Sequence, residues 1–177
     1  MKILLLILTL FLPATSFALT GAQLVTLANG IKAETNPAIV TARNTRDDWT
    51  VYNYVNSATT TLVWSDSTPS SNLVDVAPLT LYDGLTQGKR DEWRLLLDYN
   101  QSMDMRNTSK RNVIVDAWGT ASRSVPILQA GTRYATRGEL YFGASNPQTT
   151  NSVSAVVLNY YGTISLDDVS NALNLAQ

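Results

Sequence analysis

The chain has 177 residues, 45% of them apolar and 15% charged, and its net charge is −1. This length suits one domain with a hydrophobic core, and the near-neutral charge excludes the basic footprint of a nucleic-acid-binding protein. Cysteine and histidine are both absent. Their absence excludes disulfides, thiol nucleophiles, Ser-His and Cys-His dyads, thiolate metal sites and the commonest transition-metal ligand. Chemistry based on carboxylate, lysine or tyrosine side chains remains open.

Residues 1–18 have the pattern of a secretory signal peptide. A positively charged start precedes an apolar stretch over 3–12, and Ser16 and Ala18 supply the small residues of a cleavage site. The apolar stretch is too short to span a bilayer, which needs about 20 residues. We expect cleavage after Ala18. The alternative is an uncleaved apolar leader, which would be the only part of the chain to contact a membrane. Residues 19–177 are expected to form a single mainly helical domain.

Three helix signals follow the leader. Thr20 and Gln23 have the spacing of a capping box at the start of an amphipathic helix. Pro37 begins a short helix that runs to Arg43, and the segment 45–48 caps a third helix. One face of this third helix is rich in aromatic residues and is interpreted as core, with a partner groove as the alternative: Trp49, Tyr52 and Val55.

Two stretches predict strands. Residues 59–64 are β-branched and aromatic, and residues 152–161 have a similar composition, so we expect them to pair as a small ribbon. Residues 65–71 predict an exposed flexible loop of Ser, Asp, Thr and Pro, and 145–152 predict a second polar loop. A two-stranded ribbon is marginally stable alone and needs helices packed behind it.

Residues 83–142 contain most of the arginine residues and two clear helix signals in succession. Thr86 is expected to cap a helix whose apolar stripe ends at Leu97. A second helix is expected from about Ser109 to a stop at Gly119.

Two further helices are predicted after Gly119. One is expected to begin near Ser124, with Pro126 in its first turn, where a missing N–H costs nothing. Thr136 and Glu139 then form a capping box, and Gly143 is expected to end that short helix.

The last helix is predicted to begin after a cap at Ser165. Asp167 and Asp168 lie in its first turn, where the helix dipole favours negative charge, and capping is preferred to a metal or catalytic pair as their explanation. Its buried stripe is expected to be Leu166, Val169, Ala172 and Leu173. Taken together, these signals predict a mainly α fold of six or seven short helices with a small two-stranded β element.

The charged and aromatic side chains of 83–142 allow two interpretations. In the first, they form ion pairs and caps between helices: Arg90, Asp104, Arg111, Asp116, Arg133, Arg137 and Glu139. In the second, one face of arginine and tryptophan contacts a partner protein, because both residue types are enriched at binding hot spots. The candidate partner-contact residues are Arg90, Trp93, Arg111, Trp118, Arg133 and Arg137.

No motif in the chain predicts a catalytic, cofactor-binding or metal-ligating residue. The chain lacks a dinucleotide fingerprint, a P-loop, a zincin helix and an EF-hand loop. A carboxylate pair of the glycosidase type can come from any two positions, and the sequence favours no pair over another.

Four segments resemble, in their order along the chain, small and mostly uncharacterised proteins that are encoded among the virion genes of tailed bacteriophages. The segments are 89–93 (KRDEW), 113–119 (VIVDAWG), 133–143 (RYATRGELYFG) and 162–169 (GTISLDDV). The resemblance covers about the C-terminal two thirds of the chain. It implies a role in or on the virion and carries over no catalytic residue.

Three functional hypotheses follow. The first is a non-enzymatic structural or accessory component of the phage particle. It would act through contacts with other virion proteins in a homo-oligomeric ring or array, without nucleic acid or a cofactor. The alternative is an exported binding protein encoded by a phage, located in the periplasm or secreted. The third is a carboxylate-based hydrolase, which would need paired acidic groups in a deep pocket.

Overall fold

The computed structural model describes residues 18–98, 101–119 and 121–176. The predicted signal peptide therefore lies outside the described residues, apart from Ala18. Within them the chain forms nine α-helices, one 3-10 helix and three two-stranded antiparallel sheets. The mainly α fold is confirmed, with more helices than the six or seven predicted and three small sheets in place of one.

The elements follow one another in short segments. The helices are α1 (Gly21–Ala33), α2 (Pro37–Thr45), α3 (Asp48–Val55), α4 (Ser70–Val76), η1 (Leu79–Gly84), α5 (Gln87–Asp98), α6 (Thr108–Trp118), α7 (Ala121–Ala130), α8 (Arg137–Tyr141) and α9 (Leu166–Leu175). The strands are β1 (Ala58–Trp64), β2 (Thr68–Pro69), β3 (Ser102–Met103), β4 (Thr132–Thr136), β5 (Gln148–Thr150) and β6 (Val153–Ala155).

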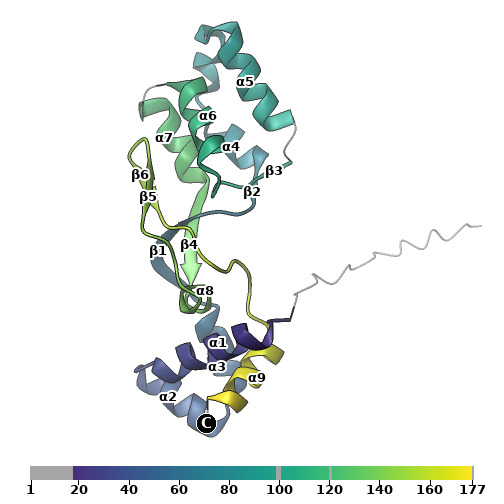
Figure 1. Ribbon diagram of the computed structural model, residues 1–177. Coiled ribbons are helices and arrows are strands. Elements are labelled where there is room, and N and C mark those ends of the chain that lie inside the picture. Colours follow the sequence, from purple (N-terminus) through teal and green to yellow (C-terminus); the bar gives the residue numbers. More distant parts are fainter. Residues whose placement is uncertain (1–17, 99–100, 120, 177) are drawn as a thin grey trace, which may run out of the picture.

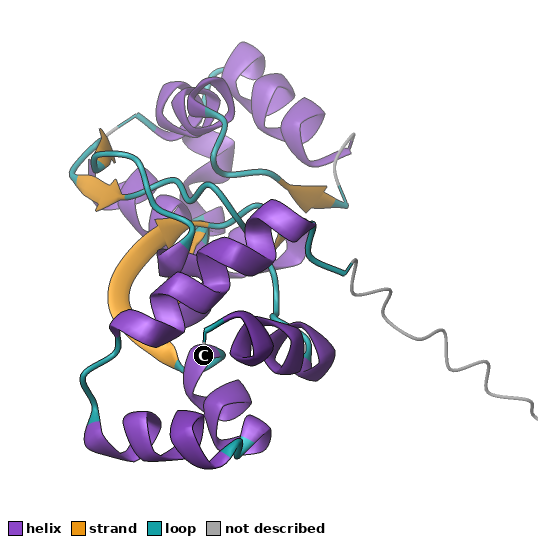
Figure 2. Cartoon of the chain, turned by 60° about the horizontal axis from the view of Figure 1, so that its bottom comes forward, coloured by secondary structure: helices purple, strands orange, loops and turns teal. Residues whose placement is uncertain are grey.

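The helices form two groups at opposite ends of an elongated molecule, joined by the β1–β4 ribbon (Figure 1). We call α1, α2, α3 and α9 the base, and α4, η1, α5, α6 and α7 the head. Each group encloses its own hydrophobic cluster. The ribbon curves strongly between them, as the orange strands of Figure 2 show. Helices α1 and α9, the first and last helices of the described residues, pack against each other in the base.

Local caps determine where the base helices begin. Thr20 Oγ1 accepts the N–H of Gln23 at 3.4 Å, and Gln23 Oε1 accepts the N–H of Thr20 at 2.9 Å, so the predicted capping box is confirmed. Asn36 caps α2, in which Pro37 is the first residue. A proline there loses no helical hydrogen bond because the first N–H groups of a helix have no partner within it.

Helix α3 begins at a different cap from the one expected. Thr45 ends α2, and Asp47 caps α3 by accepting the N–H of Thr50 at 3.1 Å. The interpretation of its aromatic face as core is wrong for Trp49, which is 61% exposed and stacks on Tyr52 with ring centroids 5.2 Å apart.

The predicted last helix, α9, is confirmed, with Ser165 as its cap. Val169, Ala172 and Leu173 are buried against α1 and α3 as expected. Leu166, expected in the same stripe, is exposed because it opens the helix one turn before the packed residues.

The predicted pairing of the two β-branched stretches is wrong in its main part. The partner of β1 is β4, whereas residues 152–161 contribute β6, which pairs with β5 as a hairpin. Backbone pairing between this stretch and β1 is limited to Val156, which forms a parallel bridge to Val63. Its N–H donates to the Leu62 carbonyl at 3.0 Å, and its carbonyl accepts from Trp64 N–H at 3.0 Å. A local pattern identifies a strand, but tertiary packing selects its partner.

Both predicted polar loops contain secondary structure instead. Residues 65–71 include β2 and the start of α4, and both Ser65 and Thr68 are buried, so this segment is not an exposed flexible loop. Residues 145–152 include β5, whose Thr150 is buried. Burial of these serine and threonine residues shows that a polar composition alone does not place a segment at the surface.

The head helices α5 and α6 agree with the sequence. Thr86 accepts the N–H of Lys89 at 3.5 Å at the start of α5, whose Trp93 and Leu96 are buried. Helix α6 is capped by Asn107 and stops at Gly119, whose φ of 75° lies in the left-handed region that favours glycine.

Helix α7 begins earlier than predicted. It starts at Ala121, so Pro126 lies inside the helix and not in its first turn. The helix forgoes one backbone hydrogen bond at that proline, while Ile127 and Leu128 bury completely in the head cluster. Burial of this apolar face outweighs the lost hydrogen bond.

The predicted short helix α8 is confirmed. Thr136 Oγ1 accepts the N–H of Glu139 at 3.2 Å, and the Glu139 carboxylate accepts the N–H of Thr136 at 2.8 Å. Gly143 follows the helix with a φ of 87°.

Candidate functional site

The six candidate contact residues do not share one exposed face. Trp93, Arg111 and Trp118 are buried in the head, where the two indole rings meet edge to face with centroids 5.4 Å apart. These three side chains cannot touch a partner in this conformation. Arg90, Arg133 and Arg137 are partly exposed, and their role as contacts stays a prediction.

Arg111 is 1% exposed and holds the head together through hydrogen bonds, not through the ion pair expected of it. Its guanidinium lies over the Trp64 ring, 4.4 Å from the centroid. Burial lowers the pKa of Arg111, although Asp104 and Tyr161 act in the opposite direction. All five of its N–H groups find oxygen acceptors, on Met105 O, Arg106 O, Thr108 Oγ1, Gln148 Oε1 and Thr150 Oγ1.

Arg133 and Glu139 form an ion pair at the waist of the molecule, between the ribbon and α8. The two guanidinium nitrogens lie 2.9 Å and 2.5 Å from the two carboxylate oxygens. Glu139 also accepts the N–H of Gly162 at 3.0 Å, which ties the C-terminal segment to the ribbon. Burial would raise the pKa of Glu139, but these hydrogen bonds and that from Thr136 outweigh it and hold the pKa below its usual value.

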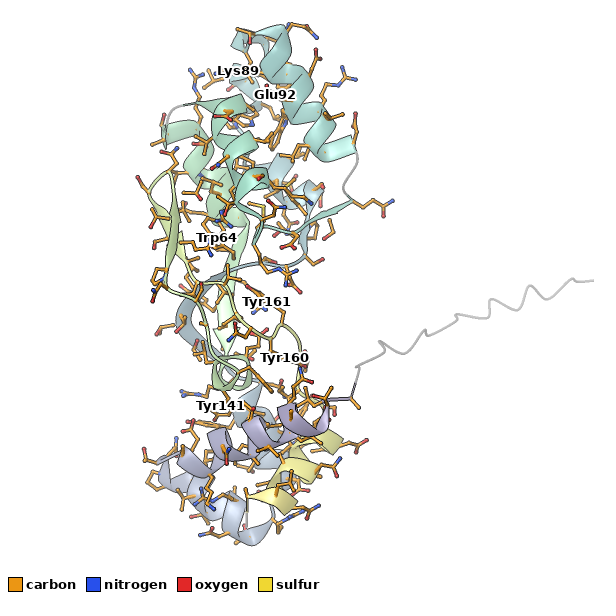
Figure 3. All side chains as sticks on the ribbon, in the orientation of Figure 1. Trp64, Lys89, Glu92, Tyr141, Tyr160 and Tyr161 are labelled. Carbon is orange, nitrogen blue, oxygen red and sulfur yellow. The ribbon has the colours of Figure 1, made fainter. Side chains whose placement is uncertain are left out.

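Tyr161 lies at the waist of the molecule (Figure 3), where its ring is close to two guanidinium groups. Arg106 and Arg133 lie over its ring at 4.8 Å and 5.4 Å from the centroid. Arg106 in turn pairs with Asp104 at 2.8 Å, and hydrogen bonds from Arg106 hold the pKa of that carboxyl below its usual value. The interpretation of arginines as ion-pair partners is therefore confirmed for Arg133 and Glu139, and Asp104 pairs with Arg106.

Glu34 joins the base to α8. It accepts hydrogen bonds from the hydroxyls of Tyr54, at 2.8 Å, and Tyr141, at 2.7 Å. Burial and this hydrogen bond raise the pKa of Tyr141 far above its usual value. Arg137 lies over the Tyr54 ring, 4.5 Å from its centroid. One carboxylate thus connects α1, α3 and α8.

Gly30 leaves room for the Tyr141 ring against α1, and we expect its replacement by alanine to destabilise the base by about 1–3 kcal/mol. A Cβ at Gly30 would lie 2.3 Å from Tyr141 Cγ, so α8 would have to move and the hydrogen bond to Glu34 would break. Thermal unfolding followed by circular dichroism measures the loss. Gly21→Ala is the matched control in the same helix, because nothing lies within 4 Å of a Cβ there. Equal stability of the two variants would contradict the expectation.

The hydrogen-bond networks around Glu34, Asp104 and Glu139 hold helices and strands in place, and each of these carboxylates accepts several hydrogen bonds. Among the residues that the structure describes, no group of three or more Asp and Glu side chains is placed to hold a metal ion. In the same residues, no helix combines the length and apolar character of a membrane span.

Sequence reasoning missed a set of large apolar side chains at the surface. Trp49 of the base is the most exposed of them, at 61%, and Leu79 of the head is 51% exposed. Near Leu79, Val76 and Leu81 are also exposed. The signal was present in the sequence, because 72–85 is apolar without a helical or alternating period, which leaves no face to bury all of it.

The chain was compared with models of known protein families, with curated proteins and with solved structures, and none of these comparisons found a match.

Proposed function

We propose that this chain is a non-enzymatic structural or accessory component of a tailed bacteriophage particle that acts through protein–protein contacts. Two things support the proposal: the ordered resemblance of four segments to proteins encoded among virion genes, and the apolar side chains exposed at both ends of the molecule. The exposed apolar side chains are the observation that supports a role in protein–protein contacts. Trp49 in the base and Leu79 in the head lie at the surface although each would stabilise the fold if buried.

The side chains that hold the ends in position fit such a role. Arg111, Glu139 and Glu34 each bind several segments of the chain, so the head, ribbon and base form a connected scaffold. A rigid scaffold lowers the entropy cost of association, because fewer groups must be ordered on binding. Repeated copies in a particle follow its symmetry, so we further propose a homo-oligomeric ring or array in contact with other virion proteins.

Mass spectrometry of purified particles tests the proposal directly. We expect this chain among the particle proteins at a fixed copy number. Purified particles that lack the chain, while infected cells contain it, would overturn the proposal.

Trp49→Ser is expected to lower the incorporation of the chain into particles roughly tenfold or more, because truncated aromatic hot spots cost 2 kcal/mol or more. Its stability should change by no more than about 1 kcal/mol, because the side chain is exposed and loses its stacking on Tyr52. Quantitative mass spectrometry of particles measures incorporation. Tyr134→Ser, at an exposed aromatic residue of the ribbon, is the matched control. Unchanged incorporation of the Trp49 variant would remove this residue from the contact surface.

The alternative, an exported binding protein in the periplasm, is favoured by one observation. Leu19 is buried in the base and donates its backbone N–H to Asp168, so the residue that follows the predicted leader is part of the packed base. Fractionation of the producing cells distinguishes the two proposals: a chain that begins at Leu19, collects in the periplasm and is absent from particles supports the alternative.

A further inference from the structure

Asp168 is a buried carboxylate that forms no ion pair with any of the described residues. Its residue is 4% exposed, and none of the three ion pairs within 18–98, 101–119 and 121–176 includes it. Ser165 Oγ donates to its Oδ2 at 2.7 Å, and the N-terminal end of α9 offers a favourable dipole. Removal of a charge from water costs several kcal/mol, and a hydroxyl compensates for only part of that cost.

The remaining oxygen of Asp168 accepts a hydrogen bond from the other end of the chain. The backbone nitrogen of Leu19 lies 3.1 Å from Asp168 Oδ1, and the bond is buried. Leu19 is itself only 7% exposed and shares the base cluster with Leu24. These two residues occupy the N′ and N4 positions around the cap of α1, the positions of a hydrophobic staple that fixes how the chain enters a helix.

The nitrogen that Asp168 binds belongs to the peptide bond that the predicted cleavage would break. The leader pattern places cleavage between Ala18 and Leu19. In the structure Ala18 is exposed, whereas the side chain of Leu19 is buried in the base. The predicted cleavage would therefore place the new N-terminus on a residue that packs in the base.

We propose that cleavage after Ala18 produces a free α-ammonium group on Leu19 that forms a buried ion pair with Asp168, so that processing locks the first helix of the mature chain to the last. A leader peptidase hydrolyses the Ala18–Leu19 amide. Water supplies the hydroxyl of the new Ala18 carboxyl group and a proton to the nitrogen, which takes up a further proton from solvent near neutral pH. The uncleaved chain offers Asp168 only a neutral amide N–H. The proposal holds whether the mature chain works in a particle or in the periplasm.

The first arm of the test is the N-terminal sequence of the protein purified from cells that export it. We expect the sequence to begin at Leu19. A protein whose N-terminus is intact, or that begins elsewhere, would overturn the proposal.

The second arm measures how fast an amine-reactive acylating reagent modifies the α-amino group of the mature protein, with mass spectrometry of its peptides as the readout. The exposed side chain of Lys32 serves as the internal reference. We expect at least about a tenfold slower reaction in the native protein than in the same protein unfolded in urea, and an unchanged order of magnitude for Lys32. Equal native and unfolded rates would overturn the proposal.

Two variants test whether the ion pair with Asp168 is what slows acylation of the α-amino group. Asp168→Asn is expected to bring the rate of α-amino labelling close to the unfolded value. Asp167→Asn is the matched control, because Asp167 lies in the same first turn of α9 but is exposed. The control should keep the slow rate. If Asp168→Asn does not fold, the comparison of native and unfolded wild-type protein still decides the result, and a folded Asp168→Asn with full protection contradicts the pair.

Discussion

Replacement of Arg111 by methionine is expected to lower the free energy of unfolding by about 3–5 kcal/mol, because five hydrogen bonds from one buried charged group are lost together. Methionine fills a similar volume, but it donates no hydrogen bond. Five oxygen acceptors in and around the head would lose their donor, among them the Met105 carbonyl and the buried Thr150 hydroxyl. Each buried group left unsatisfied costs about 1–3 kcal/mol, and relaxation recovers part of the sum.

The position requires arginine and not merely a positive charge. Only a guanidinium offers five N–H donors in one plane, whereas a lysine ammonium offers three from a single point. The planar group also stacks on Trp64, which an ammonium does less well. Arg111→Lys should therefore remain destabilised by about 2 kcal/mol.

Urea unfolding followed by tryptophan fluorescence measures both changes, since Trp64, Trp93 and Trp118 report on the head directly. Arg94→Met, on the exposed face of α5, is the control and should stay within about 0.5 kcal/mol of wild type. A loss below about 1 kcal/mol in Arg111→Met would mean that water replaces the guanidinium at low cost.

Helix starts were predictable because the rules for caps are local. The boxes at Thr20 and Thr136 and the cap at Ser165 need only residues three positions apart, and all three occur as expected. The start of α7 was missed for the same kind of reason. Proline favours the first turn of a helix by local rules alone, but α7 begins at Ala121, and its turn before Pro126 contains the buried Ser124, which accepts a hydrogen bond from Asn151 Nδ2.

Strand pairing and side-chain burial could not be predicted from such local sequence patterns. The partner of β1 is β4, which is too distant in the sequence for a local rule to predict the pairing. Strand β4 is also short and lies between two helices. The sequence identified Arg111 and Trp118 as functional candidates by residue type. Whether such residues face a partner or the core depends on the packing of several elements. Composition equally gave no reason to place Trp49 outside, since an aromatic face on a short helix is usually buried.

Glu139→Gln is expected to destabilise the protein by about 3 kcal/mol at neutral pH. The carboxylate is 1% exposed and accepts two hydrogen bonds from Arg133 and one each from the N–H groups of Thr136 and Gly162. A glutamine amide would replace one acceptor oxygen by a donor that faces other donors. It would also leave the guanidinium of Arg133 without its counter-charge.

The pH dependence of stability identifies the contribution of this carboxylate. The pKa of Glu139 is lower in the folded protein than in the unfolded chain, so the stability it provides is fully present above the unfolded pKa, about 4.3. That stability is lost as the pH falls through the folded pKa. Wild type should therefore lose stability between pH 5 and pH 3 more steeply than Glu139→Gln, and the two curves should converge in acid.

Urea unfolding at a series of pH values from 7 to 3 gives both curves. Asp104 and Asp47, whose pKa values are also lowered by hydrogen bonds from Arg106 and Thr50, titrate alike in both proteins, so their effect cancels in the difference. Glu92→Gln, on the exposed face of α5, controls for the loss of one acidic group. A constant difference between wild type and Glu139→Gln across this range would show that Glu139 acts through its shape and not through its charge. The waist would then be held mainly by the backbone hydrogen bonds of the ribbon and of α8.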